Sequence, residues 1–242
     1  MRRISFAFAV AAVVAAAVPA FAAGSPASGL RFDPNHKITN STSSNWSGYA
    51  TTGARFVSIT SSWTEPTALC GAGETSYSSF WVGLDGDTSG TVEQTGTDAD
   101  CSSGVARYYA WYEMYPKFPT NLSNPVQPGD TLTASVTTDG VGRFTLAISS
   151  SRGWQFSTTQ RLKSASLASA EVIAEAPSSR SGVLPLTNFG AVNFGPSTAN
   201  NASLATAPNL DPITMATSSG TPKAQPGNIA SNGSFTVTWK NH

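Results

Sequence analysis

The alternation of apolar and polar positions along the chain predicts many short strands separated by turns. Residues 55–64 alternate well enough for one strand, and Pro66 ends it. Further strands are expected at 80–87, 91–98, 108–116, 131–138, 142–151, 154–159, 188–194, 212–217 and 234–240. Asp139-Gly140 is a hairpin signal between two of them. Because no long amphipathic helical pattern is present, we predict an all-β protein folded as a sandwich.

The segment 169–176 (SAEVIAEA) is compatible with two kinds of element. Its alanines and glutamates suit a helix, but the segment is short and Pro177 closes it, so we expect a strand. Strand alternation then places Glu171, Ile173 and Glu175 on one face.

The three central segments, 80–87, 91–98 and 108–116, gather unusual side chains on one face. The apolar positions of the first segment, such as Val82, point to the opposite face. The shared face carries Trp81, Asp85, Gln94, Asp98, Trp111 and Glu113. Taken singly, the amide fits a solvent-facing strand position, the tryptophans fit a core and Asp85 fits a turn. Their convergence predicts one cleft with an aromatic floor, an amide and several carboxylates.

The N-terminal residues are typical of an export signal. Arg2 and Arg3 precede an apolar run at 4–18, and Ala20-Phe21-Ala22 fits a cleavage site. A membrane anchor is the alternative, but the run is short of the ~20 residues that a span needs. We therefore expect a secreted, extracellular protein with a signal peptide at 1–22, a flexible leader or short pro-segment at 23–40, and one domain at 41–242.

Charge and cysteine content narrow the functional classes. Lys and Arg total 14, as do Asp and Glu, which gives no electrostatic case for binding nucleic acid or a membrane. Cys70 and Cys101 are the only cysteines, and in an exported chain we expect them to form a disulfide. We expect Cys101 in the loop between the segments 91–98 and 108–116. We also expect a monomer.

The positions of the two histidines exclude the commoner hydrolase mechanisms, which use histidine. His36 lies in the expected leader and His242 is the last residue, so neither suits the general base of a serine or cysteine triad. Histidine-based zinc sites fail for the same reason, and no glycine-rich phosphate loop joins a strand to a helix. We expect neither a metal nor a cofactor. Carboxylate chemistry, with or without an amide partner, is what is left.

Several of these motifs together resemble one family. The segments FWVGLDGD, EQTGTD, AWYEMYP and AEVIAEAP, with SNWSGYA at 44–50, are similar in order and spacing to the glutamic peptidases, or eqolisins. The resemblance runs from about Ser44 to the C-terminus. It implies a sandwich of two bent antiparallel sheets, of the concanavalin-like jelly-roll type, and an endopeptidase that acts on proteins or peptides at acidic pH.

The resemblance also implies roles for individual residues. Gln94 and Glu175 would form the catalytic dyad, and Glu175 rather than Glu171 matches the family glutamate. Asp85, Asp98 and Glu113 would support the dyad through hydrogen bonds, and Trp46, Trp81 and Trp111 would line the substrate cleft. The chain departs from the family pattern at Thr97, Ala99, Met114 and Val172, which bears on specificity more than on the dyad.

Two other functions fit the same residues. A glycoside hydrolase could use Glu113 and Glu175 as its carboxylate pair above an aromatic floor. A non-catalytic carbohydrate-binding module could stack sugars on Trp81 and Trp111, but it would leave Gln94 and Glu175 without a role.

Overall fold

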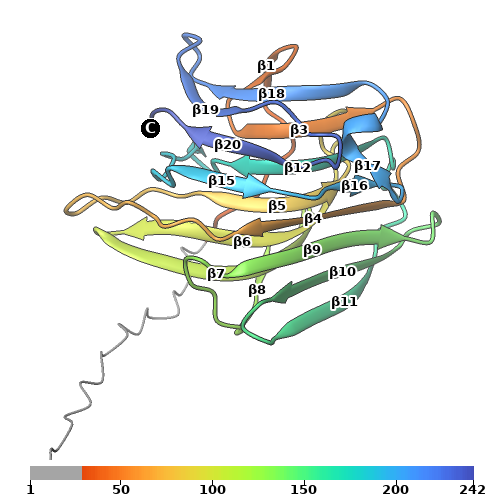
Figure 1. Cartoon of the computed structure of the whole chain (residues 1–242), viewed down its shortest axis with the longest axis horizontal. Coiled ribbons are helices and arrows are strands. Elements are labelled where there is room, and N and C mark those ends of the chain that lie inside the picture. Colours follow the sequence, from red (N-terminus) through yellow and green to blue (C-terminus); the bar gives the residue numbers. More distant parts are fainter. Residues whose placement is uncertain (1–28) are drawn as a thin grey trace, which may run out of the picture.

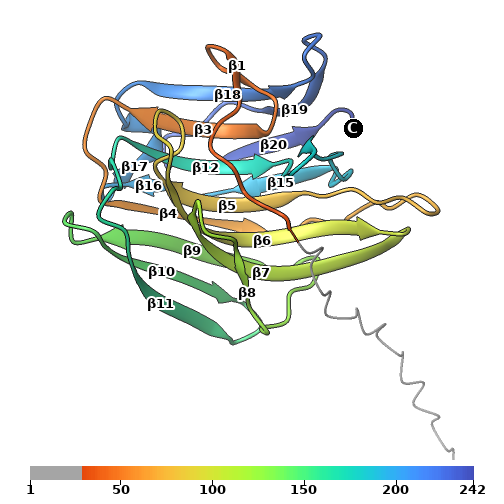
Figure 2. The ribbon, with the colours of Figure 1, turned by 180° about the vertical axis from the view of Figure 1, so that it is seen from behind.

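The computed structural model describes residues 29–242, and the signal peptide expected at 1–22 lies outside them. The described chain forms two sheets, antiparallel apart from the pairing of Thr42 and Ser43 with Thr214 and Met215, and the sheets pack face to face (Figures 1 and 2). The first sheet contains, in spatial order, β18 (Leu210–Ala216), β3 (Trp46–Thr52), β12 (Ser169–Glu175), β5 (Ser79–Leu84), β6 (Val92–Ser102), β7 (Val105–Tyr115) and β8 (Thr120–Asn121). The all-β sandwich expected from the sequence is confirmed.

The second sheet lies behind the first and continues from it through a shared strand. Its main strands are β11 (Gln155–Arg161), β10 (Arg143–Ser150), β9 (Thr131–Thr138), β4 (Ser58–Thr64), β15 (Ala191–Phe194), β20 (Phe235–Trp239) and β19 (Pro222–Pro226). Leu210–Ile213 of β18 pair with β3, whereas Met215 and Ala216 pair with β19 in the second sheet. One strand therefore serves both sheets.

Short strands complete the two sheets. They are β1 (Lys37–Thr39), β2 (Thr42–Ser43), β16 (Thr198–Ala199) and β17 (Ala202–Ser203), with a separate pair formed by β13 (Ser178–Ser179) and β14 (Gly182–Val183). A single 3₁₀ turn, Leu204–Thr206, is the one helical element among residues 29–242. The segment 169–176, which suits a helix by composition, forms β12, because it is paired on both sides by β3 and β5.

The main core lies between the sheets and follows the predicted alternation. Phe80, Val82 and Leu84 of β5 are fully buried there, while Trp81 of the same strand points to the outer face of the first sheet. A second apolar cluster lies on that outer face and includes Trp46, Trp81, Trp111 and Ile173. The outer face of the first sheet, which solvent would otherwise contact, is therefore lined by large side chains.

The hairpin between β6 and β7 differs from the sequence prediction. We expected Cys101 in a loop, but it lies within β6, and the pairing runs on to Ser102 opposite Val105. Ser103 and Gly104 both have positive φ angles, 51° and 82°, which is the geometry of a two-residue hairpin turn. The tight turn leaves room for longer strands. Cys101 forms the expected disulfide with Cys70.

The expected leader, 23–40, is described only from Gly29 onward. We expected a flexible leader or a short pro-segment here. The described part crosses the outer face of the first sheet, as Figure 2 shows at the red end of the chain, and Phe32 is 1% exposed. The apolar cluster on that face supplies the reason, because Phe32 joins it. Strands β1, β2 and β3, which carry the chain from this segment into the first sheet, were also missing from the prediction.

Candidate active site

The candidate site lies on the outer face of the first sheet, where the N-terminal segment covers the tryptophan-rich cluster. Gln94 comes from β6, Glu113 and Trp111 from β7, and Glu175 from β12. Neighbouring strands place them together because side chains at paired positions share a face, as Gln94 and Glu113 do in the β6–β7 register.

Small residues on this face let the large ones lie close to the sheet. A Cβ atom on Gly96 would stand 2.2 Å from the Phe80 carbonyl oxygen and 2.6 Å from the Trp81 Cβ. Only glycine fits there, so Trp81 can lie against β6 and direct its indole toward β12. The Q-T-G motif thus supplies both an amide and the space that a neighbouring tryptophan needs.

Gln94 is held in a defined orientation. Its Nε2 donates to Glu113 Oε2 at 2.8 Å and to the backbone carbonyl of Phe32 at 2.7 Å. These two bonds use both amide hydrogens. Gln94 is completely buried, and its Oε1 has no hydrogen-bond partner among the described residues. The amide therefore presents a fixed donor to a peptide carbonyl.

Glu175 is buried and held by two donors. Trp81 Nε1 donates to Glu175 Oε2 at 2.8 Å, and Asn45 Nδ2 donates to Oε1 at 3.3 Å. Burial raises the pKa of Glu175 well above its ordinary value, and the nearby carboxyl groups of Asp33 and Glu113 raise it further. The two donors partly offset these effects.

The remaining predicted acids occupy different places. The Asp98 carboxylate accepts from Ser79 Oγ, Tyr109 OH and Trp111 Nε1 at 2.7, 2.8 and 2.6 Å, so it fixes the Trp111 indole. Asp85 accepts from three backbone N–H groups at 166–168, each at 2.8 Å. It thereby fastens the loop that leads into β12, which carries Glu175. Of the three supporting acids, Glu113 alone hydrogen-bonds a dyad residue directly.

Asp98 shares Tyr109 with another buried carboxyl group. The Tyr109 hydroxyl lies 2.8 Å from both Asp98 Oδ2 and Asp100 Oδ2. A phenol has one proton to donate, so one of these two contacts requires a protonated carboxyl. Burial raises the pKa of Asp98 to about 7 and that of Asp100 well above its ordinary value, with Asp98 adding to the second shift. This pair is suited to acidic conditions.

The three tryptophans have three different roles. Trp111 stacks on Phe32, with ring centroids 3.8 Å apart and planes 15° from parallel. Trp46 Nε1 donates to the Asp33 carbonyl at 3.0 Å, and its ring meets Trp81 edge-on at 5.0 Å. Trp81 serves Glu175 through its N–H. Two tryptophans thus contact a peptide segment, and the third positions a carboxyl group.

Sequence reasoning missed Asn45 and Phe32. Asn45 donates to Glu175 and to the carbonyls of Asp33 and Pro34, at 3.4 and 3.1 Å. Its position in SNWSG, next to Trp46, was the available signal. Phe32 is a lone aromatic in an aperiodic segment, which predicts no element, so only the folded chain shows where it lies.

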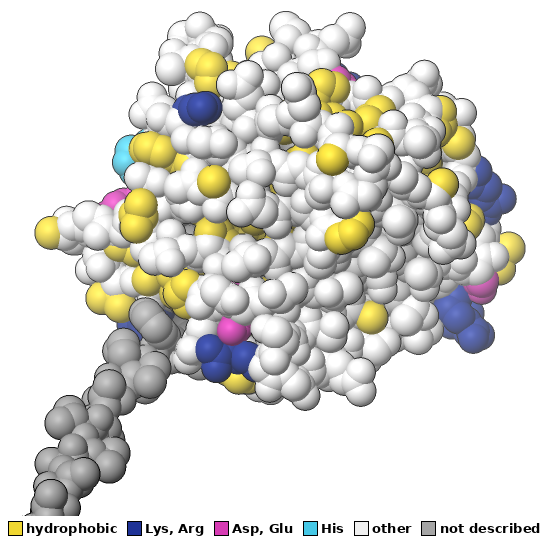
Figure 3. Space-filling model, in the orientation of Figure 1, with side chains coloured by type: hydrophobic (Ala, Val, Ile, Leu, Met, Phe, Trp, Pro, Cys, Tyr) yellow, Lys and Arg dark blue, Asp and Glu magenta, His cyan; other side chains and the backbone are white. Residues whose placement is uncertain are grey.

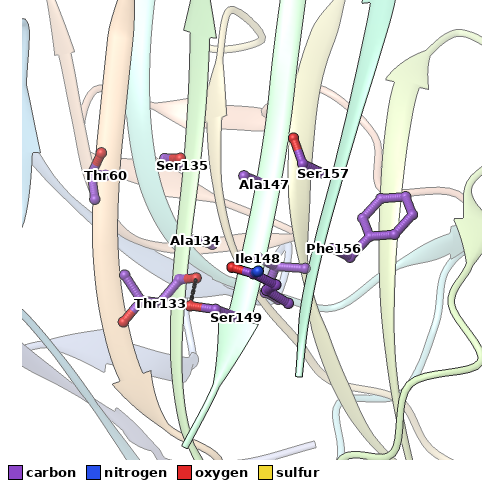
Figure 4. Close-up of a pocket in the computed structure, with 10 residues that line it drawn as sticks. Thr60, Thr133, Ala134, Ser135, Ala147, Ile148, Ser149, Phe156 and Ser157 are labelled. Atoms are coloured by element: carbon purple, nitrogen blue, oxygen red, sulfur yellow. Dashed lines mark hydrogen bonds between the residues drawn. The ribbon is translucent and has the colours of Figure 1, made fainter. Parts of the chain in front are cut away.

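One surface depression away from the candidate site has no carboxyl group among its lining residues. It has a volume of about 510 Å³, lies on the outer face of the second sheet and is lined mainly by Ser, Thr and Ala side chains (Figure 4). Charged side chains are few on the face shown in Figure 3. The depression has no ionisable lining residue and so offers no acid–base chemistry.

Comparison with known proteins agrees with this fold. The Peptidase A4 family model matches residues 44–239, so the chain belongs to the Peptidase A4 family. Two curated relatives are aspergillopepsin-2 of Aspergillus niger, 32% identical over 39% of this chain and 40% of its own length, and scytalidopepsin B of Scytalidium lignicola, 34% identical over 50% and 47%. The matched stretches thus span less than half of these relatives.

Solved structures give the fold. A scytalido-glutamic peptidase bound to a transition-state analogue matches with a TM-score of 0.70 and 22% identity, over 81% of this chain and 98% of its own. The aspergilloglutamic peptidase of Aspergillus niger matches with a TM-score of 0.59 and 25% identity, over 68% and 99%. The resemblance to the glutamic peptidases seen in the sequence is confirmed.

Proposed function

We propose that this protein is a secreted endopeptidase that hydrolyses peptide bonds at acidic pH with a Gln94–Glu175 dyad. One observation carries the proposal. The buried Gln94 amide donates at 2.7 Å to a backbone carbonyl, that of Phe32, in an extended segment that crosses the outer face of the first sheet. A donor aimed at a peptide carbonyl is what an oxyanion site requires.

In the proposed mechanism, Glu175 serves as base and then as acid. The ionised carboxylate takes a proton from a water molecule, whose oxygen attacks the scissile carbonyl carbon. Gln94 Nε2–H stabilises the oxyanion that forms, and such a donor contributes roughly 3–4 kcal/mol to the barrier reduction. Glu175 then gives the proton to the departing amine.

The surrounding residues support the two steps. Glu113 accepts one hydrogen of the Gln94 amide, and the second amide hydrogen is left for the substrate. Trp81 and Asn45 fix both oxygens of Glu175, and Asn45 also reaches the carbonyl next to the one that Gln94 binds. These hydrogen bonds therefore fix the position of the bound peptide relative to the dyad.

Membership of the Peptidase A4 family favours this function over the two carbohydrate-based alternatives. A glycoside hydrolase would use Glu113 as one of its acids, yet here Glu113 accepts the Gln94 amide. The proposed substrates are proteins and peptides, and we propose that the protein acts as a monomer.

We further propose that the protein acts outside the cell. The signal-like sequence at 1–22 supports export, and the Cys70–Cys101 disulfide fits an oxidising compartment. No helix within residues 29–242 has the length and apolar character needed to cross a membrane. Recovery of the protein from the culture medium, with an N-terminus after Ala22 or beyond, would test this.

The activity is tested with purified protein and a denatured protein substrate at about pH 3.5, below the ordinary pKa of a glutamate. Wild type should cleave in the presence of pepstatin, which inhibits aspartic peptidases. Gln94→Ala and Glu175→Gln should each lose at least a hundredfold in kcat, consistent with the loss of a donor or base. Gln155→Ala, on the exposed end of β11, is the matched control and should keep full activity. An inactive wild type, or an active dyad variant, would refute the proposal.

A further inference from the structure

Lys223 in β19 is a buried cation without a partner of opposite charge. It is 7% exposed, and its Nζ donates to the Ser44 carbonyl oxygen over a long distance, 3.4 Å. None of the ion pairs formed within residues 29–242 includes Lys223. An ammonium group has three hydrogens to donate, so two of them have no acceptor in the described chain. Buried charges in proteins are normally paired, and an unpaired one therefore marks a candidate binding site.

The Lys223 side chain lines a surface depression of about 430 Å³, which is within the size range of pockets for small ligands. The other lining residues come from parts of the chain that are far apart in sequence: Ser44, 183–185, 216–218 and His242. Figure 1 shows the C-terminal end of the chain, marked C, close to β19 and β20. Neither Gln94 nor Glu175 lines this depression, so it is distinct from the candidate active site.

The backbone around Lys223 holds the side chain at a fixed place. In the pairing of β18 with β19, Met215 lies opposite Ala224 and Ala216 lies opposite Pro222, so Lys223 is the extra residue of a bulge. Bulges redirect a side chain out of the regular alternation of a strand. The Lys223 carbonyl also accepts from the N–H groups of Lys240 and Asn241, at 2.7 and 3.1 Å. The ammonium is therefore positioned by the fold.

The walls of the depression determine which anions fit beside this ammonium. Val183, Leu184, Pro185 and Ala216 contribute apolar surface. No aspartate or glutamate is among the lining residues, so an incoming anion meets no carboxylate there. A bare inorganic anion would leave the apolar walls unused. A carboxylate carried on an apolar stem would use both the ammonium and the walls.

We propose that the depression around Lys223 binds a carboxylate on an apolar stem, which is either a free aliphatic acid or the C-terminal end of a peptide. The carboxylate accepts the two remaining hydrogens of the Lys223 ammonium, and the stem lies against Leu184 and Ala216. Burial lowers the pKa of Lys223, and a bound carboxylate would raise it again by favouring the charged form. This inference is independent of the proposed peptidase function.

The test titrates sodium hexanoate into the full-length chain carrying Glu175→Gln at about pH 6, where an ordinary carboxyl group is ionised. Two-dimensional NMR should show the amide signals of Leu184, Ser218 and Lys223 shifting together and saturating. Lys223→Met should weaken binding by about tenfold or more, the factor expected for a charge-assisted hydrogen bond. Lys240→Met, an exposed lysine nearby, is the matched control and should leave the Kd unchanged. Hexanamide has the same stem without the charge and should bind about tenfold more weakly.

Two further ligands separate the sources of the carboxylate. If the dipeptide acetyl-Ala-Leu binds more tightly than hexanoate, and its C-terminal amide does not bind, the ligand is the end of a peptide. If hexanoate binds more tightly than the dipeptide, the ligand is an aliphatic acid. Equal shifts with chloride or phosphate at the same concentration would show unselective attraction of anions and would overturn the proposal. An unchanged Kd in Lys223→Met, or the lack of any saturating shift, would overturn it too.

A measurement on the parent chain covers the case in which Lys223→Met does not fold. Acetic anhydride modifies neutral lysine amines, and the modified positions are identified by peptide mass spectrometry. Saturating hexanoate should slow the modification of Lys223 by about tenfold, because the bound carboxylate keeps the ammonium protonated and covered, while Lys240 reacts as before. Equal modification of Lys223 with and without hexanoate would contradict the proposed site.

Discussion

The stability of the protein should fall as the pH rises, and Glu93 gives a measurable part of this effect. Glu93 lies in β6, next to Gln94 in sequence, and is completely buried. Burial, followed by the nearby Asp85 carboxylate, raises its pKa from 4.5 to about 9. The folded chain therefore keeps a proton on Glu93 across a pH range in which the unfolded chain has lost it.

The sign and size of the effect follow from this difference. Below about pH 4.5, Glu93 is protonated in both the folded and the unfolded chain, and its contribution to the stability of the fold is fully present. That contribution is lost as the pH rises toward about 9. At about pH 7.5, three units above the unfolded pKa, the loss from this group is about 4 kcal/mol at 1.36 kcal/mol per unit. This is an upper value, because water entering the site would reduce it.

Urea unfolding at about pH 4 and pH 7.5 would measure the effect, with all proteins carrying Glu175→Gln to prevent self-digestion. Glu93→Gln should be within about 1 kcal/mol of its parent at the lower pH, because glutamine resembles a protonated glutamate in shape. At the higher pH it should be the more stable protein by as much as about 4 kcal/mol.

A second glutamate provides the control for this measurement. Glu74 has a lowered pKa, chiefly because Ser76 Oγ donates to it, so Glu74→Gln should not gain stability at the higher pH. If Glu93→Gln loses as much stability as its parent between the two pH values, Glu93 is ionised in the folded chain and the reasoning is wrong.

Three further changes test the site and the fold. Glu113→Leu removes the acceptor that orients Gln94 and should lower kcat about a hundredfold with a smaller change in KM. Glu113→Gln keeps an acceptor, so its kcat should stay within tenfold of wild type. Equal kcat values for the two variants would refute this role of Glu113. Gly96→Ala should destabilise the fold by more than about 3 kcal/mol in urea unfolding, because its Cβ would stand 2.2 Å from a carbonyl oxygen, and a smaller cost would argue against this packing. Cys101→Ser should cost about 3–4 kcal/mol by the same assay, since it opens a 31-residue loop, and an unchanged midpoint would contradict that account.

Much of the first sheet could be predicted from local pattern. Alternation sorted Phe80 and Val82 to the core and Trp81 to the outer face, because a strand has a fixed period of two. The same rule placed Gln94 and Glu113 on the face of the candidate site. The resemblance, rather than alternation, selected Glu175 over Glu171.

The two glutamates have different neighbours in the folded chain. The carboxyl group of Glu175 accepts from Trp81 and Asn45, and its pKa is raised by Asp33 of the N-terminal segment. The groups that affect the Glu171 pKa are Ser169, Asp87, Asp85 and Glu93. Which carboxyl groups share a region depends on the twist and pairing of several strands. A single strand's pattern does not contain that information.

The sequence by itself determined many of the strands, the faces of the central ones and the single possible disulfide, because these depend on residue type and on the spacing of near neighbours. Tertiary structure decided how the site is assembled. Asp85 fastens a loop at 166–168, and Asn45 joins Glu175 to the backbone of the N-terminal segment. It also decided that Phe32, in a stretch without periodicity, covers the tryptophan cluster. Burial of an exposed apolar face selects whichever segment can reach it, and that is a property of the folded chain.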